Sequence, residues 1–290
     1  MDTATPAVTA ALHDGTRVLA EATTVARLSA RQGTVPPLGG GRGAPAAKGS
    51  HSELLVPAIG QVLTEAGVDR ADLTAVAVGV GPGPYTGLRV GVVTARVLGA
   101  VLGIPVHGVC SLDIIAADVE APRFLVATDA RRREVYYACY DGTGRFAGPQ
   151  VARPADIEWR DGLPAVGEGA RMYDSDFPAF VGEGPLYPSA ATLCRIVAAE
   201  LAGGAQARFS GPELLPPVPL YLRRPDAREP GAPKRVTERE RGAAVTGLSG
   251  ATEERGSGAR EGAARKRPEA SAGSTERERG AAATGPGAGQ

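Results

Sequence analysis

A glycine-rich segment offers the first candidate chemistry. Residues 81–87 read GPGPYTG and follow the apolar run LTAVAVGV at 73–80. Three glycines and two prolines predict a backbone conformation that most residues avoid, and Thr86 is a suitable N-cap for a following helix. Free amides at a helix start can bind phosphate, so an anion site is one hypothesis. The segment has neither the lysine of a P-loop nor the spacing of a dinucleotide-binding turn, so the sequence gives that hypothesis little support.

Two acidic pairs indicate an internal duplication. Asp2 and Asp14 are twelve residues apart, as are Asp129 and Asp141, and both Asp14 and Asp141 begin the tripeptide DGT. A strand-like run fills each interval, and Asp-Gly is a strong signal for a hairpin turn. We therefore expect one ββ unit to occur twice, once at the head of each of two similar α/β lobes.

Histidines and cysteines show no metal-binding pattern. No histidine has another histidine four residues away, the spacing that places two imidazoles on one helix face, and His51 has Leu55 at that offset. The three cysteines form no CxxC pair; they are Cys110, Cys139 and Cys194. We expect no metal site and no disulfide framework, and we expect the thiols to be small buried side chains in a reducing compartment.

Composition limits the classes of protein to which this chain can belong. The 290 residues contain 32 basic and 32 acidic side chains, so overall charge gives no reason to expect tightly bound nucleic acid. No apolar run approaches the length of about 20 residues that a spanning helix needs. We expect a soluble cytoplasmic protein that does not bind a membrane.

Composition also divides the chain near residue 226. Beyond it, large apolar side chains nearly vanish, and the segment TERERGAAVTG at 237–247 returns as TERERGAAATG at 275–285. Such a region buries too little apolar surface to offset the entropy of ordering it. We expect a disordered low-complexity tail over 226–290, with an interaction tail as the alternative.

The remaining elements can be placed from local signals. Residues 39–49 form a glycine-rich loop. A helix is expected from Ser50, which has capping-box spacing to Glu53, to Gly67, with a kink at Pro57. The apolar runs 73–80 and 104–109 flank a helix over 86–102, which predicts a parallel strand pair with a right-handed crossover.

Small residues recur along the second helix. Gly87, Gly91, Ala95 and Gly99 are four residues apart and share one face. Each internal glycine costs about 1 kcal/mol relative to alanine, so another element is expected to pack there closely. Two partners are open: the sheet or a neighbouring helix of this chain, or the surface of another subunit.

The segment GPGPYTGLRVGVVTARVLGAVLGIPVHGVCSL at 81–112 resembles the signature of the TsaB family, in which GPGSFTGLR continues into a small-residue helix. Further segments resemble the family over residues 2–227: DTATPAVTAALHDG, HSELLVPAIGQVL, ATDARRREVYYACYD, VGEGA and PLYLRRPDA. The resemblance implies an α/β, two-lobed actin-like ATPase (ribonuclease H-like) fold with duplicated mixed-sheet subdomains. We expect a first lobe over 1–105 that carries the partner-binding helices, and a second over 106–225 whose last segment packs back on the first.

The resemblance also implies a function. Family members are non-catalytic scaffolds that pair with the catalytic paralogue TsaD and work with the ATPase TsaE. Together they transfer a threonylcarbamoyl group to the adenosine beside the anticodon of tRNA. The chain alone is then expected to bind no cofactor, whereas ATP or ADP and a metal ion belong to partner subunits. It reaches tRNA through the complex, and a homodimer is possible without TsaD. The alternative is an independent hydrolase, either an ATPase or a peptidase.

Site residues follow from the same resemblance. The TsaD contact is expected on the helices from His51 and from Thr86, and the candidate residues are His51, Leu55, Ile59, Val62, Tyr85, Thr86, Gly87, Arg89, Gly91, Ala95 and Gly99. Asp2, Thr3 and Asp129 match positions that face nucleotide in active relatives, but DTAT and DARR lack the accompanying phosphate-loop glycines. We therefore expect little or no ATPase activity and no catalytic residue. Arg131, Arg132 and Arg133 either contact phosphate or tRNA, or form a solvated turn.

Two departures from the family pattern stand out. Family members carry an apolar strand before the segment that matches DTATPA, and Met1 precedes Asp2 here. We expect the natural protein to start upstream of this Met1. The loop at 39–49 is also longer than is usual in the family.

Overall fold

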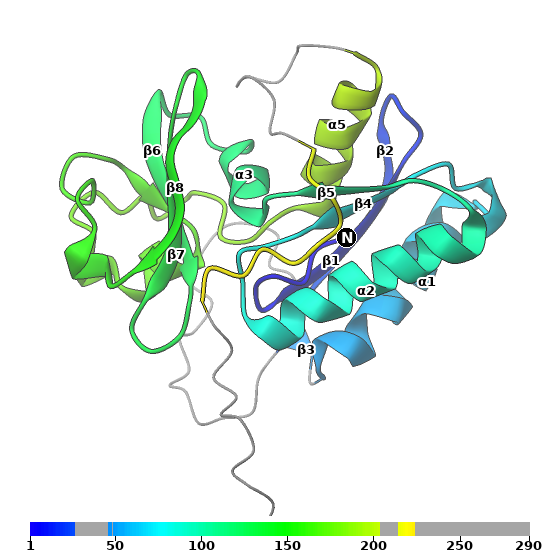
Figure 1. Ribbon diagram of the computed structural model, residues 1–290, viewed down its shortest axis with the longest axis horizontal. Coiled ribbons are helices and arrows are strands. Elements are labelled where there is room, and N and C mark those ends of the chain that lie inside the picture. The colour runs from blue at the N-terminus through cyan, green and yellow to red at the C-terminus, as the bar shows by residue number, and fades with distance from the viewer. Residues whose placement is uncertain (27–45, 48, 204–213, 224–290) are drawn as a thin grey trace, which may run out of the picture. The chain divides into compact units, whose positions relative to one another are not determined.

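The computed structural model describes residues 1–26, 46–47, 49–203 and 214–223 (Figure 1). All of them belong to one compact unit, Met1–Ala227. The predicted tail over 226–290 and most of the predicted loop over 39–49 lie outside the described residues.

The chain opens with the predicted hairpin. β1 (Ala7–His13) and β2 (Val18–Ala26) pair antiparallel, and β3 (Ala46–Ala47) pairs parallel with β2. At the turn, the Asp14 carboxylate accepts hydrogen bonds from the Thr16 amide at 2.8 Å, the Thr16 hydroxyl at 2.7 Å and the Arg17 amide at 2.8 Å. This Asx geometry explains why the Asp-Gly sequence marks the turn.

The first helix, α1 (His51–Ala66), follows the predicted signals closely. The Glu53 carboxylate accepts a hydrogen bond from the Ser50 amide at 2.6 Å, and Gly67 ends the helix in the left-handed region with φ 65°. The helix continues through Pro57 and packs on β1 and β2. A short turn of 3₁₀ helix, η1 (Arg70–Asp72), leads to the next strand.

The predicted strand–helix–strand unit is confirmed. β4 (Val76–Gly79) and β5 (Val106–Val109) pair parallel, and α2 (Tyr85–Leu102) connects them. The N-cap of α2 is Pro84, not Thr86, because the helix begins one residue earlier than predicted. By length and composition α2 could also span a membrane, contrary to the expectation that no segment reaches that length. However, one side of α2 packs on β4, as in a core helix.

The boundary between the lobes differs from the predicted one. A division at 105/106 separates β4 from β5, although these two strands are hydrogen-bonded to each other. α3 (Ser111–Ala116) follows β5, and α5 (Ala190–Leu201), from much later in the sequence, packs on β1, β2 and β4 (Figure 1). The described residues of 214–223 return to β5, since Leu215 exchanges 2.8 Å backbone hydrogen bonds with Gly108.

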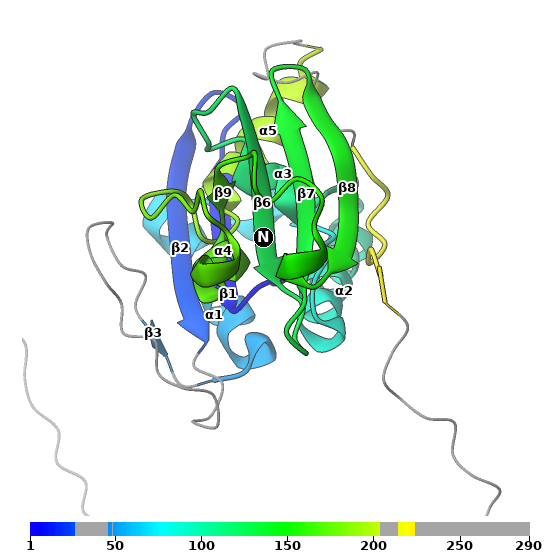
Figure 2. The ribbon, with the colours of Figure 1, turned by 90° about the vertical axis from the view of Figure 1, so that its left-hand side faces the viewer.

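The four-stranded sheet of the second lobe repeats the first hairpin. β6 (Arg123–Asp129), β7 (Val135–Asp141), β8 (Gly144–Ala152) and β9 (Ala165–Val166) lie in the order β8-β7-β6-β9 (Figure 2). Between β7 and β8 the Asp141 carboxylate accepts from the Thr143 amide at 2.8 Å and its hydroxyl at 2.7 Å, as Asp14 does in the first lobe. The predicted duplication of the ββ unit is therefore visible in the structure.

Short helices complete the second lobe. They are η2 (Pro154–Asp156), α4 (Glu168–Met172) and η3 (Asp174–Asp176). The core beneath the sheet includes Phe124 stacked on Tyr140, with ring centroids 5.3 Å apart. Cys110 and Cys139 are buried as predicted, whereas Cys194 is half-buried.

Candidate functional site

The small-residue face of α2 points into the molecule. Gly87, Gly91, Ala95 and Gly99 are all buried. A Cβ atom on Gly91 would collide with the Thr3 hydroxyl, and one on Gly99 would collide with the Val106 side chain. The assignment of these four residues to a subunit interface is therefore wrong. Their partner is the alternative that the sequence left open, the chain's own sheet together with its N-terminal segment.

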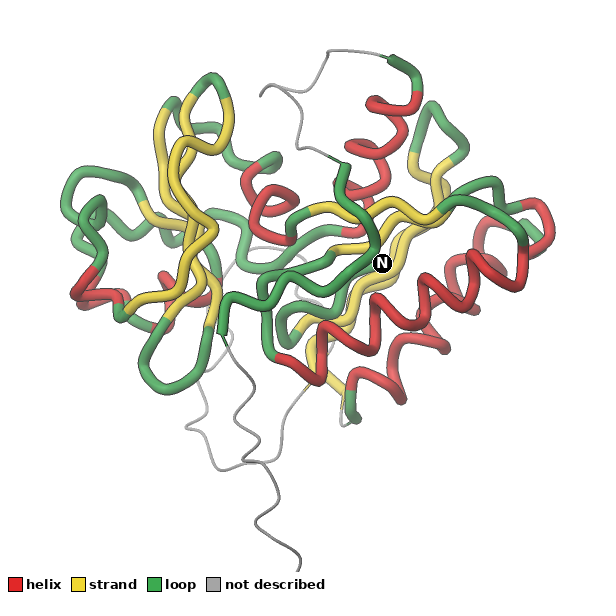
Figure 3. Tube along the Cα trace, viewed as in Figure 1, coloured by secondary structure: helices red, strands yellow, loops and turns green. Residues whose placement is uncertain are grey.

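The opposite face of α2 carries the exposed apolar surface. Val93, Val97 and Val101 are 53%, 54% and 76% exposed, and Val56 on α1 is 64% exposed. The two helices contact each other on the same side of the strands (Figures 1 and 3). We call these four residues the valine face. Sequence reasoning missed it, although the valines repeat every four residues just as the glycines do.

The other predicted partner-binding residues divide between core and surface. Leu55 and Val62 are buried and Ile59 is partly buried, so the first two cannot contact a partner directly. His51 is also partly buried, and its Nε2 lies 2.8 Å from the Thr5 carbonyl oxygen. Its position fits the predicted role at the helix start.

Three predicted residues do lie at the surface, at the start of α2. Tyr85, Thr86 and Arg89 are exposed. The Tyr85 ring stacks on Tyr221 with centroids 5.2 Å apart, and the Arg89 guanidinium lies 4.6 Å from the Tyr85 ring centroid. The returning segment around Tyr221 thus adds an aromatic side chain to the end of this surface, which sequence analysis did not predict.

Asp2 and Thr3 do not face an open nucleotide site. Both are buried, and the Asp2 carboxylate accepts hydrogen bonds from the Ser111 hydroxyl at 2.5 Å and the Ala4 amide at 2.7 Å. The Thr3 hydroxyl donates to the Gly87 carbonyl at 2.7 Å and accepts from the Gly91 amide at 3.0 Å. It is therefore inserted into the hydrogen-bond ladder of α2. These side chains position the helix, which corrects their proposed nucleotide-facing role.

The glycine-rich turn at residues 81–84 also forms its contacts with other residues of the same chain. The Gly81 amide donates to the Ser111 hydroxyl at 3.1 Å, and the Ser111 amide donates to the Gly81 carbonyl at 2.7 Å. Gly83 lies against the backbone of Ala4, where no Cβ would fit. Gly81 has φ +95°, which favours glycine. The turn therefore serves to connect β4 to α2, and a phosphate would have to displace these contacts.

Asp129 lies in a polar group at the end of β6. Its carboxylate accepts from the Arg131 amide at 2.9 Å, and the Arg131 guanidinium lies 3.5 Å from the same carboxylate. Arg131, Arg132 and Arg133 all have positive φ, and the last two are exposed. A phosphate or tRNA contact by these arginines stays a prediction.

Glu168 is a buried carboxyl group close to Asp129. Burial is the main cause that raises its pKa to about 7, and the charge of Asp129 adds to that rise. The Tyr187 hydroxyl lies 3.4 Å from Glu168 Oε1, and Oε2 has no hydrogen-bond partner among the described residues. The VGEGA segment that contains Glu168 resembles the family, but its sequence does not predict an acid with a raised pKa.

Glu168 leads to a prediction about pH. A folded-state pKa above the unfolded value means that the group stabilises the fold at low pH and loses this contribution as pH rises toward about 7. Between pH 5 and 8 the wild type should lose about 2 kcal/mol more stability than Glu168→Gln. Urea unfolding at each pH measures the difference. Parallel pH profiles for the two proteins would contradict the raised pKa.

The described residues contain no cluster of three or more His, Cys, Asp or Glu side chains that could hold a metal ion.

Residues 19–201 match the family model TsaD, tRNA N6-adenosine threonylcarbamoyltransferase. The chain belongs to this family. Family membership places it among the proteins of tRNA threonylcarbamoyladenosine biosynthesis, and its curated and structural relatives make it a TsaB-like member.

Three relatives illustrate the likeness. Uncharacterized protein Rv3421c of Mycobacterium tuberculosis is 42% identical over 233 residues, covering 79% of this chain and 92% of that protein. The Escherichia coli tRNA threonylcarbamoyladenosine biosynthesis protein TsaB is 37% identical over 107 residues, covering 35% of this chain and 46% of TsaB. The chain thus spans about half the length of that TsaB, and likewise 46% of a Mycobacterium leprae relative.

A solved structure agrees with the family assignment. YeaZ from Pseudomonas aeruginosa matches with a TM-score of 0.54 and 29% identity, over 76% of this chain and 97% of YeaZ. The predicted α/β actin-like fold is thereby confirmed for the matched part of the chain.

Proposed function

We propose that this TsaB-like chain is a non-catalytic subunit that activates a TsaD-type paralogue for threonylcarbamoyl transfer to the adenosine beside the anticodon of tRNA. The observation that carries the proposal is the valine face, Val56, Val93, Val97 and Val101, exposed on two neighbouring helices. In a member of this family, such a surface supports a role in subunit pairing.

The arrangement of the face suits a helical partner. Val93, Val97 and Val101 follow one another at four-residue spacing, which aligns them along one side of α2. Apolar side chains repeated in this way are typical of helices that pack against an apolar groove or another helix. Tyr85 and Arg89 extend the same surface at the N-terminal end of α2 and supply aromatic and cationic contacts.

The interior of the site favours a scaffold over an enzyme. Asp2 and Thr3 stabilise the turn and α2 through buried hydrogen bonds, so binding nucleotide there would require those bonds to break. We propose that ATP or ADP and a metal ion bind on partner subunits, that TsaE is the ATPase of the complex, and that tRNA is reached through the complex. A cytoplasmic location is part of the same proposal.

The independent hydrolase receives less support. Burial raises the pKa of the Cys110 and Cys139 thiols to about 12, which makes both poor nucleophiles at neutral pH. Burial also raises the pKa of the half-buried Cys194 thiol. No described feature favours ATP or peptide cleavage by this chain alone.

Reconstitution tests the proposal directly. The full chain is co-purified with TsaD from the same organism, and modified adenosine is measured after addition of TsaE, ATP, the threonylcarbamoyl-AMP donor and tRNA. Modification should depend on the chain, and the chain alone should form neither product nor ADP. Modification at the same rate without the chain, or efficient ATP or peptide hydrolysis by the chain alone, would reject the proposal. If the chain forms a homodimer that dissociates when TsaD is added, the homodimer and the complex with TsaD use the same surface of the chain.

A further inference from the structure

The turn between β6 and β7, residues 130–134, carries three successive arginines in an unusual backbone conformation; we call it the arginine turn. Arg131, Arg132 and Arg133 have φ of 64°, 56° and 61°. Glycine is the usual residue in this left-handed region, because a Cβ atom there crowds the following carbonyl oxygen. No other described segment has three basic residues in succession. A turn that only reversed the chain would be less strained with glycines, so the arginine side chains themselves require an explanation.

Hydrogen bonds within the second lobe hold the arginine turn in this conformation. The Ala130 amide donates to the Glu134 carbonyl at 2.9 Å, and the Glu134 amide donates to the Arg131 carbonyl at 3.0 Å. The Asp129 carboxylate accepts from the Arg131 amide at 2.9 Å. The turn is therefore ordered before any ligand binds, which lowers the entropic cost of binding.

The segment 214–223 supports the arginine turn from the first lobe (Figure 1). The Leu220 amide donates to the backbone carbonyl at the end of β4 at 2.8 Å. Three residues later, the Arg223 Nη1 donates to the Ala130 carbonyl at 3.1 Å, and the Arg223 guanidinium forms an ion pair with Glu134. The turn is thus attached to both lobes.

The charges of the arginine turn are predominantly positive. Residues 129–134 together with Arg223 contain four arginines and two carboxylates, which leaves a net charge of +2. The two carboxylates form ion pairs with Arg131 and Arg223. Arg132 and Arg133 are exposed to solvent. Guanidinium groups in such a position suit phosphate groups, because their planar N–H donors match the phosphate oxygens in charge and geometry.

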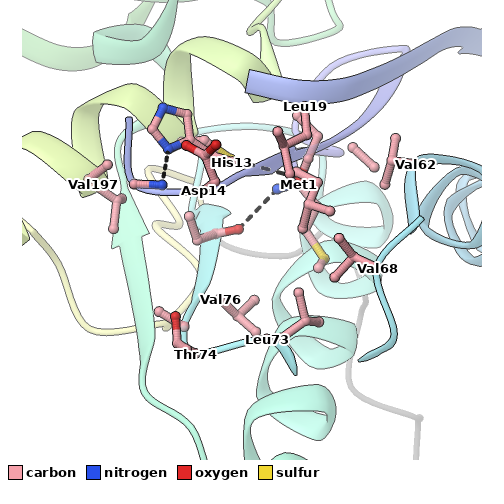
Figure 4. A pocket seen from close by; sticks show the side chains of 18 of the residues that line it. Met1, His13, Asp14, Leu19, Val62, Val68, Leu73, Thr74, Val76 and Val197 are labelled. Atoms are coloured by element: carbon pink, nitrogen blue, oxygen red, sulfur yellow. Dashed lines mark hydrogen bonds between the residues drawn. The ribbon is translucent and has the colours of Figure 1, made fainter. Parts of the chain in front are cut away.

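A deep groove in the first lobe does not offer the same chemistry. It encloses about 660 Å³ between β1 and β4, and apolar side chains such as Val62 and Val197 line its two sides (Figure 4). The described residues that line it include the carboxylates of Asp14 and Asp72, but neither lysine nor arginine. A polyanion would meet apolar and acidic groups there, so the arginine turn is the better site for phosphate.

We propose that the arginine turn binds the phosphate backbone of tRNA, with Arg132 and Arg133 as the contacting side chains. This inference rests on the proposed function, which brings tRNA to the complex of this chain with its TsaD-type partner. Contacts to phosphate position a nucleic acid without reading its sequence. Because the whole chain has no net charge, the turn alone holds tRNA weakly and adds its affinity to that of the complex.

The test measures tRNA binding by the purified complex of the full chain with TsaD. One variant carries Arg132→Glu and Arg133→Glu. The matched control carries Arg17→Glu and Arg70→Glu, which change the net charge equally at exposed positions of the first lobe. The probe is a fluorescein-labelled, unmodified tRNA transcript with adenosine beside the anticodon, and its anisotropy gives Kd at several salt concentrations.

The arginine-turn variant should bind tRNA roughly tenfold more weakly, and the slope of log K against log salt should fall by about 1 to 2. The control should bind like the wild type. If the arginine-turn variant binds like the control while it still pairs with TsaD and supports modification, this inference is overturned and the proposed function stands. A wild-type chain that neither pairs with TsaD nor supports modification would reject both.

A second variant separates binding from folding. Glycine tolerates a positive φ, so Arg132→Gly with Arg133→Gly should raise Tm by about 2–4 °C. The same variant should lose tRNA affinity, since both guanidinium groups are gone. A fall in affinity that accompanies a fall in Tm would show that the arginines act only through the fold, and it would overturn the proposed tRNA contact.

Discussion

Val97→Asp is expected to abolish pairing with the TsaD-type partner while the chain stays folded. Val97 is 54% exposed at the middle of the valine face, so a carboxylate there meets water in the free chain. In a complex the same carboxylate would be buried without a partner, which costs several kcal/mol. The buried, unpaired carboxylate and the lost apolar contact should together weaken binding by about 2–4 kcal/mol. Affinity should therefore fall by roughly 30- to 1,000-fold.

Calorimetric titration of the purified chain with TsaD measures this loss, and thermal unfolding of the free chain checks the fold. Val181→Asp is the matched control, because Val181 is 39% exposed in the second lobe, away from α1 and α2. It should bind TsaD like the wild type. Binding by Val97→Asp within threefold of the wild type would exclude the valine face as the interface.

Much of the fold could be predicted because its signals are local. The Asp-Gly turns at Asp14 and Asp141 are built from side-chain hydrogen bonds to amides two or three residues away. Likewise, the ends of α1 depend on Glu53 and Gly67, which lie within the helix or next to it. Such features need no tertiary contact and can be read in one pass along the chain.

The site was predicted less well because distant residues decide it. The Asp2 carboxylate accepts a hydrogen bond from Ser111. The Thr3 hydroxyl forms hydrogen bonds with the backbone of Gly87 and Gly91. No pattern in the sequence predicts these pairings. The same four-residue period occurs in the glycines and in the valines of α2. Periodicity alone shows that α2 has two distinct faces, and only packing against Thr3 and Val106 shows which one is inside.

Gly91→Leu separates these two interpretations of α2 most sharply. If the glycine face bound a partner, the variant would fold normally and fail to pair. In the structure, a side chain at Gly91 instead collides with the Thr3 hydroxyl, which bridges the Gly87 carbonyl and the Gly91 amide. Overpacking costs about 1–3 kcal/mol, and loss of the bridging hydrogen bonds adds about 1 kcal/mol each. The better helix propensity of leucine recovers less than about 1 kcal/mol.

We therefore expect Gly91→Leu to lower the free energy of unfolding by about 3 kcal/mol, as measured by urea denaturation of the free chain. Ala100→Leu is the control on the same helix, since Ala100 is exposed on its outer side and should change stability by less than about 0.5 kcal/mol. Wild-type stability of Gly91→Leu would mean that α2 does not pack as described. A large loss only in Gly91→Leu would show that the glycines stabilise the lobe, so that any effect on pairing follows from unfolding rather than from a lost contact.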